Sequence, residues 1–182
     1  MSIMSRSLDD LLVRLPCAER EFSAGGFLFH QGDDVRSIYL VRDGAVHLIR
    51  HQTSGAAIVL QRAGVGAILA EASLFSDRYH CDAVAVAPTR TLTVGKRALR
   101  SILANDPRLA EALAAHLARE VQATRLRAEI LSLKTVAARL DAWLASNDGD
   151  LPPRGEWKHI AAQIGTSPEA LYRELARRRR SG

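Results

Sequence analysis

Short apolar runs separated by glycine and aspartate dominate the chain from about Phe22 to Val94. The runs are rich in Val, Ile, Leu and aromatic residues, and they predict β-strands. Asp43-Gly44 lies between the runs SIYLVR and AVHLIR and predicts a hairpin, because the turn requires a positive φ that glycine tolerates. Turn residues at spacings of six to twelve residues favour a β-roll or barrel over alternating βα units.

From about Lys96 the pattern changes to a helical period. The segment KRALRSILANDP predicts a short helix that ends before Pro107. The chain from Arg108 to Ala145 contains neither Gly nor Pro and is rich in Ala, Leu, Arg and Glu. This stretch therefore predicts a long helix.

The long helix has two apolar seams. One passes through Leu113, Leu117, Val121, Thr124, Ala128, Leu131 and Thr135, and the other through Leu126, Ile130, Leu133, Ala137, Leu140 and Leu144. A helix with two apolar faces must contact two partners, so we expect a second copy of the chain on one seam and the chain's own core on the other. The alternatives are one wide core face in a monomer, or two consecutive helices that break near residues 133–135.

The C-terminal part predicts two short helices joined by a glycine turn. The stretch SNDGDLPPRGE predicts a loop. The helix WKHIAAQIG ends at Gly165 as its C-cap, and the next begins with Ser167 as N-cap and Pro168 at its first position. A glycine turn followed by a basic helix is typical of the helix-turn-helix motif that binds DNA.

Positive charge is concentrated in this last part of the chain. The net charge is +5, and from Leu151 onward seven Lys and Arg residues oppose three Glu, a local excess of +4. Basic residues clustered at one end are the usual mark of a surface that binds phosphate. A solvated basic tail is the alternative explanation.

The remaining composition excludes several classes of protein. The chain has no apolar run near the ~20 residues of a membrane helix and no signal peptide, so we expect a cytoplasmic protein without a membrane partner. Cys17 and Cys81 lie far apart, which argues against a disulfide framework, a zinc site or an iron–sulfur cluster. The six histidines follow no catalytic or zinc-binding spacing, so we expect neither an enzyme nor a metal site.

Three groups of residues, between Phe22 and Arg177, resemble the Crp/Fnr family of bacterial regulators. The first group is the spaced pattern Phe22, Gly25, Leu28, Gly32 and Asp33, followed by IYLVRDGAVHLI. It resembles the family's cyclic-nucleotide-binding β-roll. The resemblance implies an α+β fold with a β-roll over residues 1–105, a dimerisation helix over 106–135 and a helix-turn-helix domain over 136–182.

The second group resembles the family's phosphate-binding cassette, in which Glu71 matches the glutamate that holds the ribose hydroxyl. Three positions depart from the family pattern: Ala70 replaces glycine, Cys81 replaces the phosphate-binding arginine, and Asp82 replaces the following Ser or Thr. A cyclic phosphate needs a bidentate cation or several N–H donors, which a thiol beside a carboxylate does not supply. We therefore expect cAMP binding to be weak or absent, and Glu71 capping a turn is the structural alternative.

Neighbouring residues widen the possible chemistry of this pocket. Arg78 or His80 is a candidate replacement for the missing arginine. On the long helix, Thr124 matches the family threonine that touches the base, and Arg125 replaces its serine neighbour. Thr124 as a small seam residue is the alternative. His80 and Cys81 are residue types that ligate haem or sense redox state, but adjacent residues rarely reach one iron, so we predict no cofactor.

The third group, Ser167 to Arg173, resembles the family's reading helix. Glu169 and Arg173 match its base-reading positions: Glu can accept from cytosine N4–H, and Arg can donate twice to guanine. Four residues apart, they share one helix face, and a salt bridge between them is the alternative. Pro168 replaces a base-reading arginine, so we expect a different target sequence.

Other basic and hydroxyl residues of this part are candidate phosphate contacts, which position a protein on DNA without specifying sequence. They are Lys158, His159, Ser167, Tyr172 and the run Arg177–Arg180. We expect a dimeric, sequence-specific transcription regulator that binds double-stranded DNA, a second copy of itself and RNA polymerase. The alternative is a ligand- or redox-sensing module whose shortened helix-turn-helix contacts a protein. We expect the family's C-terminal wing to be missing, because the chain stops at Gly182.

Overall fold

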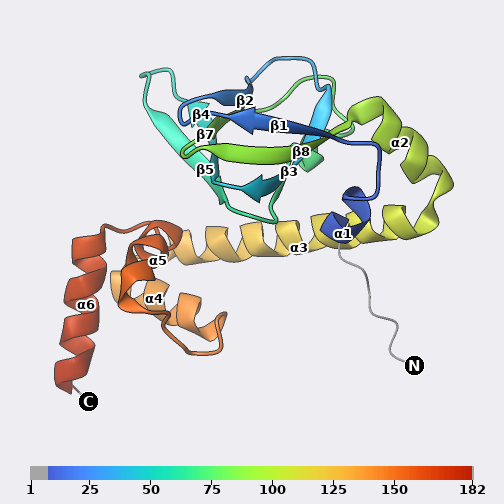
Figure 1. The fold of residues 1–182 in the computed structure, drawn as a ribbon. Coiled ribbons are helices and arrows are strands. Elements are labelled where there is room, and N and C mark those ends of the chain that lie inside the picture. Colours follow the sequence, from blue (N-terminus) through green and yellow to red (C-terminus); the bar gives the residue numbers. More distant parts are fainter. Residues whose placement is uncertain (1–7, 182) are drawn as a thin grey trace, which may run out of the picture. The chain divides into compact units, whose positions relative to one another are not determined.

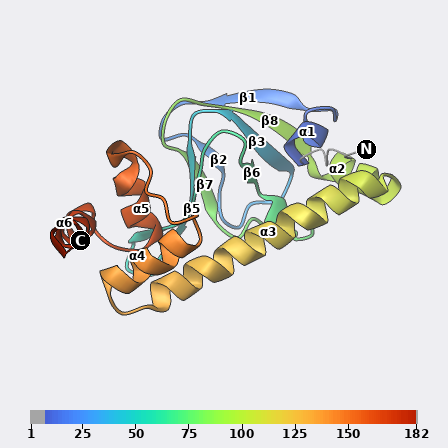
Figure 2. The ribbon, with the colours of Figure 1, turned by 90° about the horizontal axis from the view of Figure 1, so that it is seen from below.

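The computed structural model describes residues 8–181 and divides the chain into two units (Figure 1). The first unit ends at Leu117 and the second begins at Ala118. The division falls within helix α3 (Pro107–Ser132), which is one unbroken helix in Figure 2. The predicted boundaries at residues 105 and 135 remain predictions.

The first unit is a β-roll with helices at both ends. In order, its elements are α1 (Leu8–Leu12), β1 (Ala18–Phe22), β2 (Phe27–Phe29), β3 (Ser37–Asp43), β4 (Val46–His51), β5 (Ala57–Ala63), β6 (Ile68–Leu69), η1 (Glu71–Ser73), β7 (Asp82–Ala85), β8 (Thr89–Gly95) and α2 (Lys96–Asn105). Within the described residues the strands form two four-stranded sheets, ordered β1-β8-β3-β6 and β2-β7-β4-β5, and all neighbouring strands are antiparallel.

The hairpin predicted at Asp43-Gly44 is wrong, because β3 and β4 belong to different sheets. Gly44 does have the expected positive φ, 84°. A Cβ at this position would also collide with the carbonyl oxygen of Pro88 and with Thr89. The turn carries the chain from one sheet to the other, since turn chemistry fixes the local φ but does not select the partner strand.

One apolar core joins the two sheets to the helices of the first unit. Val41 of β3 and Val46 of β4 are fully buried in it, and Ala83 of β7 is buried beside them. Leu109 and Leu113, from the first turns of α3, complete the core. The start of the long helix therefore covers the β-roll through ordinary hydrophobic burial.

The second unit contains the end of α3 followed by α4 (Val136–Ala145), η2 (Arg154–Glu156), α5 (Trp157–Gln163) and α6 (Pro168–Ser181). The single helix predicted for residues 108–145 is wrong, and the two-helix alternative is confirmed by the break between α3 and α4. Thr135 caps α4 by accepting from the Ala138 N–H at 3.1 Å. Arg139 donates to the carbonyl oxygen of Leu133, at 2.8 Å, and so satisfies an acceptor of the connection.

The two seams of the helical region have different fates. Ile130 and Leu140 of the second seam are buried in the core of the second unit, as expected for the seam that faces the chain itself. In the first seam, Leu113 packs in the core of the first unit, but Val121 is 47% and Leu131 is 39% exposed. The second copy on this exposed stretch remains a prediction.

The turn between α5 and α6 confirms Ser167 as N-cap, whereas the C-cap of α5 is Ile164 and the predicted Gly165 follows it. Gly165 has a φ of 63°, and a Cβ there would collide with the side chain of Leu131. Ser167 accepts from the Ala170 N–H at 3.2 Å, and Pro168 is the first residue of α6. No helix within residues 8–181 is both long and apolar enough to span a bilayer.

Candidate functional site

The cassette of the first unit keeps its backbone shape without its glycine. Ala70 has a φ of 68° and caps η1 in the left-handed conformation, which costs a non-glycine residue about 1–2 kcal/mol. Its side chain is buried, so the surrounding core holds it in place. The frame around Glu71 therefore survives the substitution.

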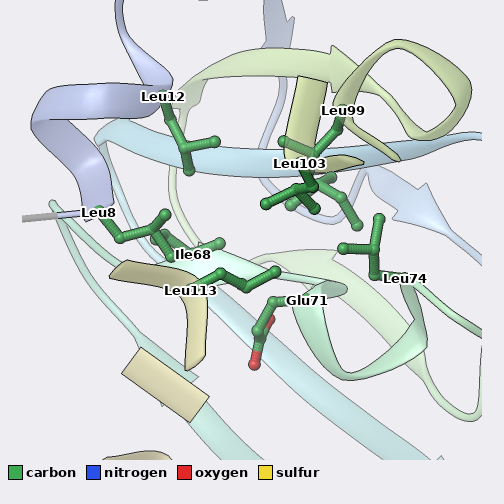
Figure 3. A pocket seen from close by; sticks show the side chains of 9 residues that line it. Leu8, Leu12, Ile68, Glu71, Leu74, Leu99, Leu103 and Leu113 are labelled. Carbon is green, nitrogen blue, oxygen red and sulfur yellow. The ribbon is translucent and has the colours of Figure 1, made fainter. Parts of the chain in front are cut away.

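Glu71 is buried at the edge of an enclosed apolar cavity (Figure 3). The other lining side chains are aliphatic: Leu8, Leu12, Ile38, Ile68, Leu74, Leu99, Leu103 and Leu113. In Figure 3 the carboxylate of Glu71 extends away from Leu99 and Leu103. The cavity holds only about 10 Å³, room for at most one water, so it is a packing defect of the core and not a nucleotide pocket.

Cys81 occupies the position of the expected phosphate-binding arginine, and it is 1% exposed. Burial raises the pKa of its thiol to about 11; Asp82 and Glu71 add to this effect, whereas Arg50 opposes it. The thiol is therefore neutral and protonated at physiological pH. It offers no positive charge to an anion, and a protonated, buried thiol reacts slowly with oxidants.

Asp82, the first residue of β7, is bound by donors of the protein itself. One carboxylate oxygen accepts from the backbone N–H of Gln31 at 2.7 Å and lies 3.5 Å from the ring of His30. The other lies 3.6 Å from the ring of His51. The carboxylate thus links β2, β7 and β4 at one end of their sheet, and its charge repels any anion placed beside Cys81.

The two proposed replacements for the missing arginine have other partners. Arg78 forms an ion pair with Asp34 at 2.9 Å. The ring of His80 is hydrogen-bonded to the hydroxyl of Ser73 at 3.0 Å, and burial followed by the charge of Arg50 lowers the pKa of His80. Both arrangements leave the cassette without a free cation from these two residues.

Arg50 is the cation that the sequence analysis missed. Its guanidinium donates to the carbonyl oxygen of His80 at 2.8 Å, and its charge acts on both Cys81 and His80. Only the pairing of β4 with β7 brings it there, so no sequence pattern announces it. Within residues 8–181 no group of three or more His, Cys, Asp or Glu is arranged to hold a metal ion.

Thr124 and Arg125 lie in the second unit, on the exposed side of α3. Their predicted contact with a nucleotide base remains a prediction.

The start of α6 presents the two predicted base-reading side chains to solvent. Glu169 and Arg173 are exposed and one helical turn apart. The pKa of Glu169 is lowered by its own backbone N–H, by the hydroxyl of Ser167 and by the charge of Arg173. No ion pair joins Glu169 to Arg173 in the described chain, so the salt-bridge alternative is not what the structure shows. Both groups are charged and available for a partner.

The arginine run at the end of α6 divides into two kinds of side chain. Arg177 and Arg178 bind the carboxylate of Glu174 at 2.8 and 2.7 Å, and these hydrogen bonds lower its pKa to about 2. Arg178 also binds Asp141 of α4 at 2.6 Å, so it fastens α6 to α4. Arg179 instead lies over the ring of Trp157, 5.4 Å from its centroid.

The other candidate phosphate contacts surround this helix. Lys158 and His159 are exposed on α5. Tyr172 is half-buried, with its ring centroid 5.5 Å from that of Trp157. The contact of each with a phosphate remains a prediction, as it does for Ser167 and Arg177.

Comparisons with known proteins agree with this architecture. Residues 19–106 match the family model of the cyclic nucleotide-binding domain. The chain is 32% identical over 160 residues to a cyclic AMP receptor protein of Thermus thermophilus, covering 86% of the chain and 74% of that relative. It is 28% identical to the global nitrogen regulator of Synechococcus elongatus, covering 72% of the chain and 60% of that relative.

Solved structures give the same result. The catabolite activator protein of Thermus thermophilus is similar, with 26% identity, a TM-score of 0.56 and coverage of 96% of this chain and 84% of the other. FixK2 of Bradyrhizobium japonicum shares the fold at 20% identity, with a TM-score of 0.69 and coverage of 92% and 87%. The predicted α+β fold, a cyclic-nucleotide-binding β-roll followed by helices, is confirmed.

Proposed function

The chain belongs to the Crp/Fnr family of transcriptional regulators, and we propose that it is a dimeric, sequence-specific DNA-binding member that binds cAMP weakly or not at all. Relatives of the chain are named as transcriptional or global regulators and not as enzymes, which supports a regulatory activity. The observation that carries the proposal is the pair Glu169 and Arg173, exposed and unpaired with each other at the capped start of α6.

This pair suits the edges of bases in a major groove. A guanidinium can donate two parallel hydrogen bonds to guanine, and an ionised carboxylate can accept from cytosine N4–H. The lowered pKa of Glu169 favours the ionised form that this contact requires. Pro168 cannot supply a polar side chain at the preceding position, so α6 would read a short sequence from few residues.

A second copy of the chain would cover the exposed seam of α3. Val121 and Leu131 are large apolar residues with 47% and 39% exposure, and Thr124 and Ala128 lie between them on the same seam. Burial of such a stripe against its symmetry mate is the ordinary way to pair two long helices. Paired reading helices bind half-sites about 34–36 Å apart, one turn of the duplex.

The residues around Cys81 support the second part of the proposal, that cAMP binds weakly or not at all. A neutral thiol at Cys81 and an internally bound carboxylate at Asp82 replace the groups that would attract a cyclic phosphate. Such a regulator would bind DNA without cAMP, or would respond to another ligand. We expect such a regulator to act in the cytoplasm, with RNA polymerase as a partner.

The test is selection of genomic fragments by the purified chain, followed by binding measurements at several salt concentrations with and without 1 mM cAMP. We expect a preferred sequence with two-fold symmetry, a dimer by analytical ultracentrifugation and no more than a small change with cAMP. Steep salt dependence without sequence preference would reduce the interaction to electrostatic association. A strong gain with cAMP would contradict the proposal for the pocket.

A further inference from the structure

A groove in the second unit lies between η2, α5 and α6, and its volume is about 280 Å³. The residues that line it are Arg154, Trp157, Tyr172, Arg173, Leu175, Ala176 and Arg179. Leu175 is buried in the core and forms the floor, whereas the arginines are exposed. We call this feature the guanidinium groove.

Two aromatic rings restrain Arg154 and Arg179 of the groove. The guanidinium of Arg154 lies 6.0 Å from the ring centroid of Trp157 and 5.7 Å from that of Tyr172. Arg179 lies 5.4 Å from the centroid of Trp157. Cation–π attraction restrains each guanidinium, and within residues 8–181 neither of the two guanidinium groups donates a hydrogen bond to the protein.

The charge of the groove is not neutralised. Each ionisable side chain in its lining, apart from the phenol of Tyr172, is an arginine, and no carboxylate lines it. No ion pair of Arg154 or Arg179 occurs within residues 8–181. Arg178 lies on the same helix as Arg179, but its charge is paired with those of Glu174 and Asp141. The groove is therefore complementary to an anion with several oxygens.

We propose that the guanidinium groove binds backbone phosphates of the same DNA duplex that α6 reads, with Arg154 and Arg179 as the donors. This inference rests on the proposed function. Arg173 lines the groove and also belongs to the base-reading face, so a duplex held by that face brings its sugar–phosphate edge to the groove. Stacked, restrained guanidinium groups lose little side-chain entropy when they bind, which suits a contact that positions the protein.

The test uses the full chain, its selected DNA fragment and an unrelated fragment of equal length. In Arg154→Ala and in Arg179→Ala, we expect affinity for both fragments to fall by a similar factor. We also expect the slope of log K against log salt concentration to decrease by about 1 in each variant and by about 2 in the double variant. Preference for the selected sequence should be unchanged, because phosphate contacts carry no base readout.

Lys134→Ala is the matched control, because Lys134 is an exposed cation of the same unit that does not line the groove. It should change the slope less than either arginine variant. Arg179→Lys keeps the charge and loses the planar fork, so we expect part of the affinity to return. Thermal unfolding of each variant shows whether the fold is intact, and a variant that unfolds early is replaced by Arg→Gln at the same position, which removes the charge and keeps most of the side chain.

The outcomes separate the two proposals. If the wild-type chain binds neither fragment at low salt, the proposed function fails and the groove proposal fails with it. If the wild-type chain selects a fragment but Arg154→Ala and Arg179→Ala behave like Lys134→Ala, only the groove proposal is overturned. Loss confined to the selected fragment would also overturn it, because that pattern indicates base readout.

Discussion

The two candidate binding regions treat charge in opposite ways. In the β-roll, Asp82 is buried and bound by Gln31, and the neighbouring Cys81 is a neutral thiol. Arg154 of η2 and Arg179 of α6 are exposed and lie over the ring of Trp157, and no carboxylate lines the groove that they share. The first region satisfies its polar groups internally, whereas the second leaves its cations for a partner.

The contrast shows that a binding frame and a binding chemistry can be lost separately. The left-handed turn at Ala70 and the position of Glu71 keep the cassette's shape, although Cys81 stands where the phosphate-binding arginine was expected. In the second unit α5, the turn at Gly165 and α6 are present, and the two predicted base-reading side chains of α6, Glu169 and Arg173, are exposed. The four predictions below test this contrast, beginning with the one of largest expected effect.

The β-roll and the C-terminal helices have separate apolar cores. The variant Leu140→Ala tests whether these two cores unfold independently. Leu140 is fully buried in the core of the second unit, so its truncation should cost about 2–5 kcal/mol there. Both tryptophans of the chain, Trp143 and Trp157, lie in this core, so their fluorescence reports its unfolding. DNA binding should be lost while Cys81 stays protected from thiol reagents. Leu151→Ala, at an exposed site of the same unit, is the control, and parallel exposure of Cys81 would mean that the cores are coupled.

Thiol labelling tests whether Cys81 of the β-roll is buried and protonated. Cys17 is exposed and should react quickly at pH 7.5, whereas Cys81 should react more slowly by a factor of about 100 or more, because its raised pKa leaves little thiolate. Its rate should increase as the pH rises toward 11. The variant Cys17→Ser isolates the signal of Cys81. Equal rates for the two cysteines at pH 7.5 would restore the redox-sensing alternative.

Arg173→Ala tests the exposed face of α6 by removing one of the two side chains predicted to read bases. We expect a loss of about 1–3 kcal/mol in specific binding, roughly 5- to 150-fold, with relaxed preference at one base pair of each half-site. Fragment selection and titration measure both quantities. Arg173→Lys should keep the salt dependence and lose the preference, since an ammonium group cannot make the bidentate contact. Unchanged specificity in both variants would exclude Arg173 as a reader.

The smallest expected effect concerns the internal ion pairs of α6. Hydrogen bonds from Arg177 and Arg178 lower the pKa of Glu174 to about 2. A lowered carboxyl pKa stabilises the fold above the ordinary value near 4.5, and this contribution disappears as the pH falls from there toward 2. We expect Glu174→Gln to lose less than about 1 kcal/mol at pH 7, because the pairs are partly solvated, and only a small part of that loss at pH 2. Urea unfolding followed by tryptophan fluorescence measures the difference, and a gap that persisted undiminished at pH 2 would assign the loss to packing.

Several elements were predictable because their causes are local. The turn at Gly165, the cap at Ser167, the positive φ of Gly44 and the helix break near Thr135 depend on a few neighbouring residues. The partner strands of β3 were not predictable in this way. Pairing between distant strands is decided by the shared core, and the turn at Gly44 is equally suited to a hairpin or to a crossing between sheets.

The candidate site residues also fall into those that local sequence predicts and those that only tertiary packing brings together. Sequence alone predicted that Cys81 stands at the position of the phosphate arginine and that Glu169 and Arg173 read bases. It did not identify Arg50 beside Cys81, nor the groove that Arg154 and Arg179 form with Trp157. These groups lie far apart along the chain or on different elements, and only packing brings them together.

By itself the sequence determined the family, the order of β-roll and helices, and the chemical types available at each candidate site. Tertiary structure alone decided which charged groups have partners: Asp82 is bound at the strand ends around it, Arg178 by Asp141 of α4, and Arg154 and Arg179 form no ion pair within residues 8–181. The physical reason is that a side chain's type is fixed along the chain, whereas its ionisation and its availability depend on burial and on partners that folding supplies.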